Sequence, residues 1–439
     1  MVLFLHNRYR TTGGEERVVN ELLALVRSRL GEPAELLERD SAGLGNARAA
    51  TALLRGGVAP REVAKAVRLT GARAVHAHNL GPLFGWRALA AARAEGARIV
   101  LHLHQYRLVC ATGVCFTGGQ ECTRCHGRNT LPGVIRNCRG ARAEALAYGA
   151  SLAMWQARLV AQADAVIVPS EFARARLQEL GAPLDFERVR VLAPPLRMPE
   201  TSRDDGRPHD DGRPHGDGPG SVTGGVVPGP AAGGYALVVS RLAPEKGVDV
   251  AIDACRMADV PLVVAGDGPE GDALRARVEH AVKASAPRAR GGAAELEDHH
   301  TRSGYAESPA PPMRLGPGEV RFVGRVNDTE LERLRKGAAL AIVPSRSAET
   351  FGMAAAEAMA AAVPVVASRI GALPELVDES GLAEPGDAGS LAAAIERRWA
   401  DAGVGKRGQD RVRELCAPDV VAEGLRAVYG TNQAGGRRA

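Results

Sequence analysis

Residues 344–377 read PSRSAETFGMAAAEAMAAAVPVVASRIGALPELV, and the rest of the chain can be understood outward from this stretch. An apolar run at 338–343 leads into it and predicts a buried parallel strand. A short loop containing Glu349 follows, and then an alanine-rich helix that carries Glu357. One carboxylate therefore lies just before the helix and the other about one turn inside it.

The start of this predicted helix suits an anion. The backbone amides of Phe351, Gly352 and Met353 have no partner within the helix, and they lie at its positive end. A phosphate binds well at such a position. The neighbouring carboxylates suit the hydroxyl groups of a sugar or a ribose. The alternative interpretation is an ordinary crossover helix that carries two surface glutamates.

The whole stretch resembles the E-x(7)-E signature of the retaining glycosyltransferases of family 4, which share the GT-B architecture. The match continues through residues 364–368 (PVVAS) and 371–377 (GALPELV). The chain departs from the family pattern at Ala362, where the family usually has a glycine. This substitution costs little if the backbone at Ala362 is not at positive φ.

Length and composition describe a globular protein. A chain of 439 residues predicts two or more domains, and a net charge of +5 without a nucleic-acid-binding motif argues against nucleic acid as a partner. No basic start with an apolar core and cleavage site appears, and no apolar run approaches the roughly 20 residues that span a bilayer. The sequence therefore predicts a cytoplasmic protein whose cysteines are thiols or metal ligands.

The N-terminal half alternates strand and helix patterns, which predicts a parallel, doubly wound sheet. Apolar stretches at 74–79 and 99–104 both end in polar residues. Ligands bind beyond the carboxyl ends of such strands, so His78, Asn79 and His104 are predicted to lie at a cleft. The resemblance implies that His104 meets the donor sugar; the alternative is a structural histidine.

Paired glycines, Gly13 and Gly14, lie between the first predicted strand and the first helix. Glycine allows a ligand to approach the backbone closely, although a glycine pair alone is a weak signal. The resemblance implies that this first loop faces the cleft near the donor phosphates.

An irregular loop at 105–138 contains most of the cysteines. The Cys122-x-x-Cys125 spacing is typical of zinc ligands, and Cys110 and Cys138 could complete a four-thiolate site. Packed or free thiols are the alternative. A basic segment overlaps this loop and suits phospholipid headgroups or a lipid-linked phosphate, with a solvated surface as the alternative. Its basic residues are Arg124, Arg128, Arg136, Arg139 and Arg142.

Two low-complexity segments divide the chain. Residues 199–234 contain a tandem DDGRPH repeat and no aromatic residue, which predicts a disordered linker. Residues 284–318 form a second insertion, rich in Ala, Arg, Gly and Pro. The predicted organisation is an N-terminal Rossmann-like acceptor domain (1–198), the linker, a C-terminal donor-binding domain (235–400), and C-terminal helices with a tail (401–439). Helices at about 387–399 and 409–428 are expected to pack back across the cleft.

The second half begins with a buried strand, 235–239, that brings Arg241 and Lys246 to its carboxyl end. Two cations there can neutralise a diphosphate, the arginine as a planar fork and the lysine as a point charge. The segment resembles the family's Arg-Leu-x-x-x-Lys-Gly motif, and Gly266 and Gly268 match its Gly-x-Gly-Pro turn. The resemblance also places Val326 where the family binds the nucleobase.

The resemblance therefore implies an α/β protein of GT-B fold, with two doubly wound Rossmann-like domains facing a cleft. It would be a retaining glycosyltransferase that uses a nucleotide diphosphate sugar and requires no metal for catalysis, with structural zinc as a separate hypothesis. The acceptor would be a glycolipid, a lipid-linked molecule or a polysaccharide precursor, reached by a protein in peripheral contact with the inner face of the membrane. A GT-B epimerase, a phosphorylase and a non-enzymatic nucleotide-sugar-binding protein are the alternatives. The predicted catalytic residues are Glu349, His104, Arg241 and Lys246, and the predicted donor-binding residues are Gly13, Gly14, Gly266, Gly268, Val326, Phe351, Gly352, Met353 and Glu357.

Overall fold

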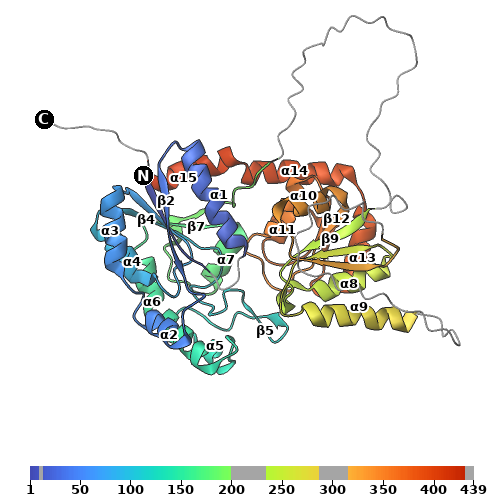
Figure 1. The fold of residues 1–439 in the computed structure, drawn as a ribbon, viewed down its shortest axis with the longest axis horizontal. Helices are drawn as coiled ribbons and strands as arrows, with labels where there is room; N and C mark the ends of the chain where they lie inside the picture. Colours follow the sequence, from blue (N-terminus) through green and yellow to red (C-terminus); the bar gives the residue numbers. More distant parts are fainter. Residues whose placement is uncertain (9–12, 199–233, 286–314, 431–439) are drawn as a thin grey trace, which may run out of the picture.

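The structure is a computed structural model, and it describes residues 1–8, 13–198, 234–285 and 315–430. The predicted linker and most of the predicted insertion lie outside the described residues. Two parallel six-stranded sheets form the centres of two α/β units that lie side by side (Figure 1). The predicted pair of doubly wound domains is confirmed.

The N-terminal sheet has the order β2-β1-β3-β4-β7-β8, and all neighbouring strands are parallel. The chain leaves β1 for β2 on one side and then returns to place β3 on the other side. The order of strands thus reverses between β1 and β3, and ligands of open α/β sheets bind at such a point. The strands are β1 (Val2–Arg8), β2 (Ala34–Asp40), β3 (Ala74–Ala77), β4 (Arg98–His102), β7 (Ala165–Val168) and β8 (Val189–Val191).

The C-terminal sheet repeats this plan with the order β11-β10-β9-β12-β13-β14, again entirely parallel. Its order reverses between β9 and β12, so the loops after these two strands flank the second predicted ligand position. The strands are β9 (Tyr235–Val239), β10 (Leu262–Ala265), β11 (Val320–Gly324), β12 (Ala338–Val343), β13 (Val365–Ser368) and β14 (Leu382–Ala383).

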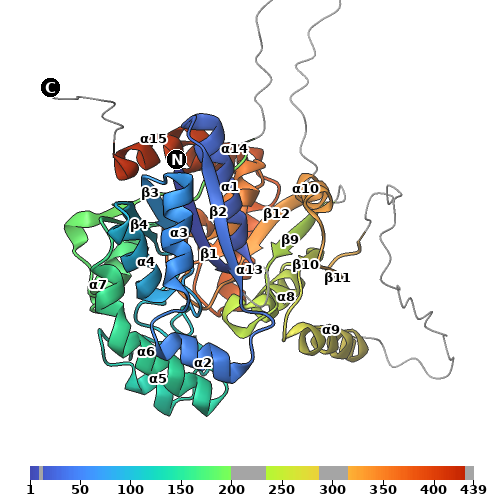
Figure 2. The ribbon, with the colours of Figure 1, turned by 60° about the vertical axis from the view of Figure 1, so that its left-hand side comes forward.

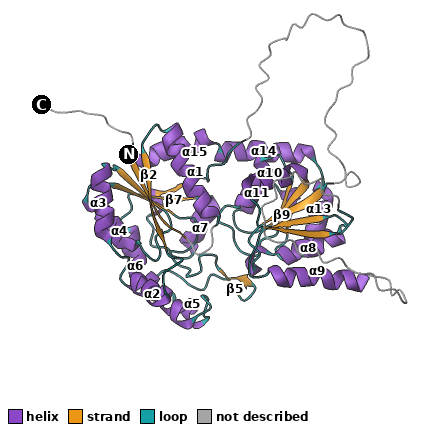
Figure 3. Cartoon of the chain, in the orientation of Figure 1, coloured by secondary structure: helices purple, strands orange, loops and turns teal. Residues whose placement is uncertain are grey.

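Helices cover both faces of each sheet (Figures 2 and 3), which is why the central strands are buried and uniformly apolar. Those of the first unit are α1 (Gly14–Arg29), α2 (Asn46–Leu54), α3 (Pro60–Thr70), α4 (Gly85–Ala94), α5 (Leu131–Ile135), α6 (Arg142–Val160) and α7 (Glu171–Glu179). Those of the second are α8 (Val248–Met257), α9 (Gly271–Ser285), α10 (Asp328–Gly337), α11 (Met353–Ala360), α12 (Leu373–Leu376), α13 (Ala388–Arg398) and α14 (Ala402–Cys416), with α15 (Pro418–Tyr429) ending the described chain.

The last two helices connect the two units. Helix α14 packs on α11, whereas α15 packs on α1 and beside β4 of the N-terminal unit. The predicted return across the cleft is therefore confirmed for the end of the chain, but not for the helix predicted at 387–399, because α13 packs on α8 of its own unit. The prediction of one helix at 409–428 is wrong. Ala417 is extended (ψ 139°) and separates α14 from α15, because Pro418 lacks an amide hydrogen and disfavours a helical residue before it.

Alanine at position 362, where the family usually has glycine, would cost little only if φ there were negative. The structure shows that φ is positive. Ala362 follows α11 with φ of 57°, in the left-handed region that favours glycine. The side chain of an L-residue crowds its own carbonyl in this conformation, so the alanine is strained here.

Replacing Ala362 by glycine is expected to raise the free energy of unfolding by about 1 kcal/mol, because the left-handed penalty exceeds the added entropy of the unfolded chain. Urea denaturation of the two proteins measures this difference. The matched control is Ala361→Gly: Ala361 has φ of −83°, so glycine should destabilise the protein there. Equal effects at both positions would contradict the strain at Ala362.

Candidate active site

A cavity of about 1660 Å³ lies between the two units, at the carboxyl ends of both sheets. The loops after β1, β4, β9, β10 and β12 reach it, as expected for two doubly wound sheets that face each other. The structure brings all of the predicted catalytic and donor-binding residues to this one cavity. They are Gly13, Gly14, His104, Arg241, Lys246, Gly266, Gly268, Val326, Glu349, Phe351, Gly352, Met353 and Glu357.

His78 and Asn79 do not line the interdomain cavity, so their predicted position is wrong. The backbone amide of His78 donates to the carbonyl of Leu5 at 3.0 Å, and the Asn79 side chain donates to the carbonyl of Asn7 at 2.6 Å. Both residues therefore continue along β1 after β3 ends and stay buried. They line a smaller neighbouring cavity instead.

Glu349 is the centre of a polar cluster in the part of the cavity that the C-terminal unit forms. Its Oε1 accepts hydrogen bonds from Lys246 Nζ at 2.6 Å and from Ser345 Oγ at 2.7 Å. Burial alone would raise the pKa of Glu349, but the Lys246 ammonium and these hydrogen bonds lower the pKa below its ordinary value. Glu349 is therefore a carboxylate at neutral pH, with one cation beside it.

Two close backbone approaches hold this cluster in place. Gly371 has φ of +63°, and a Cβ there would lie 2.3 Å from the Glu349 amide nitrogen. Gly247, directly after Lys246, would place a Cβ 2.1 Å from the carbonyl oxygen of Pro344. Both positions require glycine. The loop after β9 and the loop after β12 are thus in direct contact, which positions Lys246 against Glu349.

Arg241 supplies the second cation of the predicted diphosphate site. Its guanidinium pairs with Glu245 in the same loop, and its side chain is 51% exposed in the cavity. The carbonyl of Glu245 also accepts from the amide of Arg346 at 2.8 Å, so the loop is tied to the segment after β12. The guanidinium is thus placed in the open part of the cavity, within the same loop as Lys246.

Helix α11 begins in the cavity without a capping side chain. Its N-cap, Gly352, is left-handed (φ 98°), and a Cβ there would lie 2.6 Å from Leu373 Cδ2. Phe351 is buried in the adjacent core and fixes the turn. Because glycine has no side chain to accept from the first amides, this helix end has the form that binds phosphates elsewhere.

Glu357, predicted to hold the ribose, lies in an ion-pair network that the sequence did not reveal. Its carboxylate pairs with Arg335 of α10 and, at 3.1 Å, with Arg17 of α1 in the other unit. Arg335 is buried and Arg17 is 39% exposed. The helical turn after Gly13 and Gly14 could have suggested Arg17, but only the tertiary structure brings it to Glu357.

Packing explains some of the glycines predicted to bind the donor, but not all of them. Cβ atoms at Gly266 and Gly268 would lie 1.8 Å from the carbonyl oxygen of Ser240 and 2.3 Å from that of Leu242, so packing alone requires these glycines. A Cβ at Gly14 would meet no described atom within 4 Å. The fold does not explain glycine at position 14, which leaves room for a ligand near the start of α1.

His104 lines the same cavity as Glu349 and is held by other histidines. Its Nε2 is 2.8 Å from His78 Nδ1, and its ring stacks on that of His102 with a centroid distance of 4.2 Å. Its carbonyl accepts a hydrogen bond from Thr350 Oγ1 at 2.8 Å, which joins the two units. Burial lowers the pKa of His104, and the carboxylates of Glu15 and Glu16 oppose this only in part, so the ring is neutral.

Three further histidines continue from His104 into the sheet. Among the described residues, His76, His78 and His102 alone place three ligand atoms within 4.8 Å of one another. The rings of His76 and His102 are stacked, with planes 10° apart. His76 Nε2 lies 3.2 Å from His102 Nδ1, and His76 Nδ1 lies 2.7 Å from the Tyr429 hydroxyl, so both ring nitrogens of His76 already have hydrogen-bond partners. The histidines are packed side chains here and do not have the arrangement of a metal site.

The predicted four-thiolate zinc site is not supported. The cysteines of 105–138 surround a cavity of about 20 Å³, but no three of their sulfur atoms lie within 4.8 Å of one another. The segment is also less irregular than predicted, because it contains the hairpin β5–β6 (Phe116–Thr117, Gln120–Glu121) and α5. A hydrogen bond with Cys115 lowers the pKa of Cys110 to about 5. Partly buried thiols, the alternative interpretation, describe this loop.

In the described part of the chain, no helix combines the length and the apolar character needed to cross a bilayer.

Two protein-family models match the chain. The model described as Glycosyl transferase 4-like domain matches residues 8–195, and the model described as Glycosyl transferases group 1 matches residues 233–401. The two matches correspond to the two sheets and meet at the cavity. The chain belongs to the GT4-type glycosyltransferase family.

Solved structures show that this family member has the GT-B fold. HepE from Anabaena in complex with UDP is 18% identical, with a TM-score of 0.56 over 97% of this chain and 98% of that chain. Sucrose-phosphate synthase from Thermosynechococcus elongatus is also 18% identical, with a TM-score of 0.58 over 98% of both chains. At these identities the similarity shows the fold alone.

Curated relatives match over shorter stretches. O-antigen chain mannosyltransferase B from Escherichia coli is 31% identical over 37% of this chain, and the match spans 36% of that relative. The MMP alpha-(1->4)-mannosyltransferase of Mycolicibacterium hassiacum is 38% identical over 24% of this chain and 27% of its own length. The matched stretch thus spans well under half of these relatives.

Proposed function

We propose that the protein transfers a sugar from a nucleotide diphosphate donor to a hydroxyl-bearing acceptor, with retention of anomeric configuration. The observation that carries this proposal is the cluster of Lys246, Glu349 and Ser345 at the carboxyl ends of β9 and β12, in the cavity that His104 also lines. Lys246 and Arg241, which lines the same cavity, suit a diphosphate, and HepE, which shares the fold, was solved with UDP and glucose. A uridine diphosphate sugar is therefore the first donor to test.

In the proposed reaction the sugar C1–O bond to the diphosphate breaks while the acceptor oxygen bonds to C1 on the same face. The acceptor proton passes to the departing phosphate oxygen, so no protein nucleophile is needed. Arg241, Lys246 and the amides at the start of α11 neutralise the charge that develops on the diphosphate. Lys246 shifts from Glu349 to the phosphates as the donor enters, and this frees Glu349 to bind sugar hydroxyls.

His104 belongs to the acceptor side in this proposal. Its neutral ring lies between the cavity and the sheet, where it can accept or donate a hydrogen bond to the donor sugar or the attacking hydroxyl. The hydrogen bond between Thr350 and the His104 carbonyl fixes the distance between the two sides, which contributes orientation to the reaction.

A lipid-linked or glycolipid acceptor, delivered at a membrane surface, is the finer proposal. Helix α5 exposes Leu131 (60%) and Ile135 (75%) next to the arginine-rich segment. Exposed apolar side chains beside basic ones favour contact with anionic lipid. Vesicle sedimentation with and without anionic lipid measures this contact directly.

The two glutamates are expected to have separate tasks. Glu357→Gln should weaken UDP binding by about 10- to 100-fold, because a charge-assisted hydrogen bond to a ribose hydroxyl is worth roughly 1.5–3 kcal/mol. Glu349→Gln should leave UDP affinity nearly unchanged but lower turnover, because its contacts strengthen as the sugar gains positive charge. Calorimetry with UDP and initial rates for each variant measure the two effects.

The matched control is Glu332→Gln, since Glu332 is an exposed residue of α10 that does not line the cavity. If Glu349→Gln loses UDP affinity while Glu357→Gln does not, the assignment is reversed. Phosphate-dependent turnover, or interconversion of the nucleotide sugar without an acceptor, would instead identify a phosphorylase or an epimerase.

A further inference from the structure

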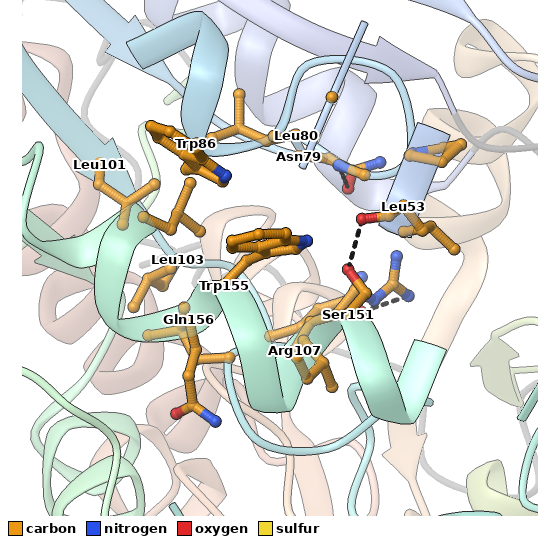
Figure 4. A pocket seen from close by; sticks show the side chains of 18 of the residues that line it. Leu53, Asn79, Leu80, Trp86, Leu101, Leu103, Arg107, Ser151, Trp155 and Gln156 are labelled. Atoms are coloured by element: carbon orange, nitrogen blue, oxygen red, sulfur yellow. Dashed lines mark hydrogen bonds between the residues drawn. The ribbon is translucent and has the colours of Figure 1, made fainter. Parts of the chain in front are cut away.

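A second cavity, of about 140 Å³, adjoins the interdomain cavity within the N-terminal unit (Figure 4). It lies between α2, α4, α6 and the end of β4. We call it the tryptophan pocket, after Trp86 and Trp155, whose rings lie 5.9 Å apart on its wall. Several leucines complete the wall: Leu53, Leu80, Leu101, Leu103, Leu108, Leu152 and Leu159.

The tryptophan pocket opens toward the proposed reaction centre. His104, Gln105 and Arg107 line both cavities, as do Leu53 and Tyr148. A molecule seated in the tryptophan pocket can therefore present a hydroxyl beside His104. The pocket is part of the acceptor side and lies away from the diphosphate site.

The pocket is held open by a contact between glycines. Gly57, after α2, would place a Cβ 1.7 Å from the carbonyl oxygen of Phe84, and Gly85 would place one 2.2 Å from that of Gly56. Gly56 has the indole of Trp86 above it, where a Cβ would lie 2.2 Å from Nε1. A larger residue at position 56 would displace the indole, and one at position 57 or 85 would push the segments after α2 and before α4 apart.

Several buried polar atoms in this pocket have no hydrogen-bond partner in the described structure. They are Nε2 of His78, Nε2 of His102 and Nε1 of Trp86. Each of these residues lines the pocket, and His78 and His102 are only 4% and 2% exposed. Buried polar groups are normally hydrogen-bonded, so these atoms mark a place where a ligand or water completes the bonding.

The composition of the wall selects the kind of ligand. A sugar ring enclosed by leucines and indoles would leave most of its hydroxyls unpaired, at a high desolvation cost. An apolar group contacts the leucines and the two indoles of this wall without burying unpaired hydroxyl groups. Its size is also limited, because an apolar cavity of about 150 Å³ holds one benzene ring.

We propose that the tryptophan pocket binds a compact apolar group of the acceptor, an aromatic ring or a short branched alkyl group, next to the hydroxyl that receives the sugar. This inference rests on the proposed glycosyl transfer and names the chemistry of its acceptor. The pocket selects acceptors by this group, while the hydroxyl extends past His104 into the interdomain cavity.

Calorimetric titration with benzyl alcohol tests the proposal, with glycerol as the polar probe. Benzyl alcohol should bind saturably and glycerol should not. Leu152→Trp fills the pocket from α6 and should weaken benzyl alcohol binding by about tenfold or more. The matched control is Leu415→Trp, at a partly buried leucine of α14 in the other unit, which should bind benzyl alcohol like the wild type.

Titration of all three proteins with UDP separates this proposal from the proposed function. UDP binding without saturable benzyl alcohol binding, or benzyl alcohol binding that Leu152→Trp leaves unchanged, overturns the pocket proposal alone. Benzyl alcohol binding that is sensitive to Leu152→Trp supports the pocket, and failure of the wild type to bind any nucleotide diphosphate counts against the donor site. Equal UDP affinity of Leu152→Trp and the wild type shows that the variant is folded.

Discussion

Replacing Lys246 by alanine is expected to lower the rate of sugar transfer by about 100- to 1000-fold, the effect seen when one preorganised charge-stabilising donor is removed from an active site. Lys246 is the cation nearest Glu349, at 2.6 Å, and its ammonium is the point charge proposed to meet the departing diphosphate. The variant also leaves the Glu349 carboxylate with only Ser345 as a hydrogen-bond partner among the contacts described. Initial rates with a saturating donor measure the loss.

The matched control is Lys406→Ala. Lys406 also pairs with a carboxylate, that of Asp410, but on the surface of α14 and with 60% of its side chain exposed. A surface pair of this kind contributes little to stability, so this variant should keep the wild-type rate. Lys246→Arg should retain part of the activity, because it keeps the charge and changes its geometry. A Lys246→Ala enzyme with nearly normal turnover would remove Lys246 from the mechanism.

Acid is expected to unfold the protein steeply. Burial, together with His104, lowers the pKa of His76 to about 3, and burial holds the pKa values of His78 and His102 well below their usual range. The unfolded chain protonates these rings near pH 6.5, whereas the folded chain does not. Stability is therefore fully present above pH 6.5 and decreases as the pH falls below it, by about 1.4 kcal/mol per pH unit for each histidine.

Three such histidines together give a loss of about 4 kcal/mol per pH unit, a large part of the stability of an ordinary domain. Urea denaturation at several pH values between 7.5 and 5 measures how the free energy of unfolding changes with pH. His102→Phe keeps an aromatic ring at this buried position. It should reduce by about one the number of protons that the protein takes up on unfolding, and the slope should be correspondingly shallower. The exposed His280 of α9 provides the control variant, His280→Gln. A slope that does not change in His102→Phe would contradict a neutral His102 in the folded state.

The sequence was sufficient for the parts of the molecule that depend on local pattern. Apolar runs predicted β9 and β12 at their observed bounds, and the motifs placed Lys246 and Glu349 on loops that the structure brings together. These successes share a cause: each motif follows a strand of the same parallel sheet, and the loops after neighbouring strands meet at the carboxyl edge of that sheet.

Features that depend on distant contacts could not be predicted in this way. Arg17 reaches Glu357 from the other unit, and no spacing in the sequence indicates that contact. His78 and Asn79 were expected at the cleft because strands were assumed to end together, but pairing with β1 continues past the end of β3. The break at Ala417 depends on one proline in an otherwise helical pattern.

The path of α15 has a consequence for how the chain matures during synthesis. Val421, Leu425 and Tyr429 lie in the same core cluster as Val2 and Phe4 of the first strand. The first strand leaves the ribosome long before this helix, so the core of the N-terminal unit stays uncovered on this side until α15 has emerged. The two units therefore cannot mature strictly one after the other. The N-terminal unit can complete its core only after α15 has been synthesised. In the interval, its exposed apolar face is the surface that a chaperone would bind.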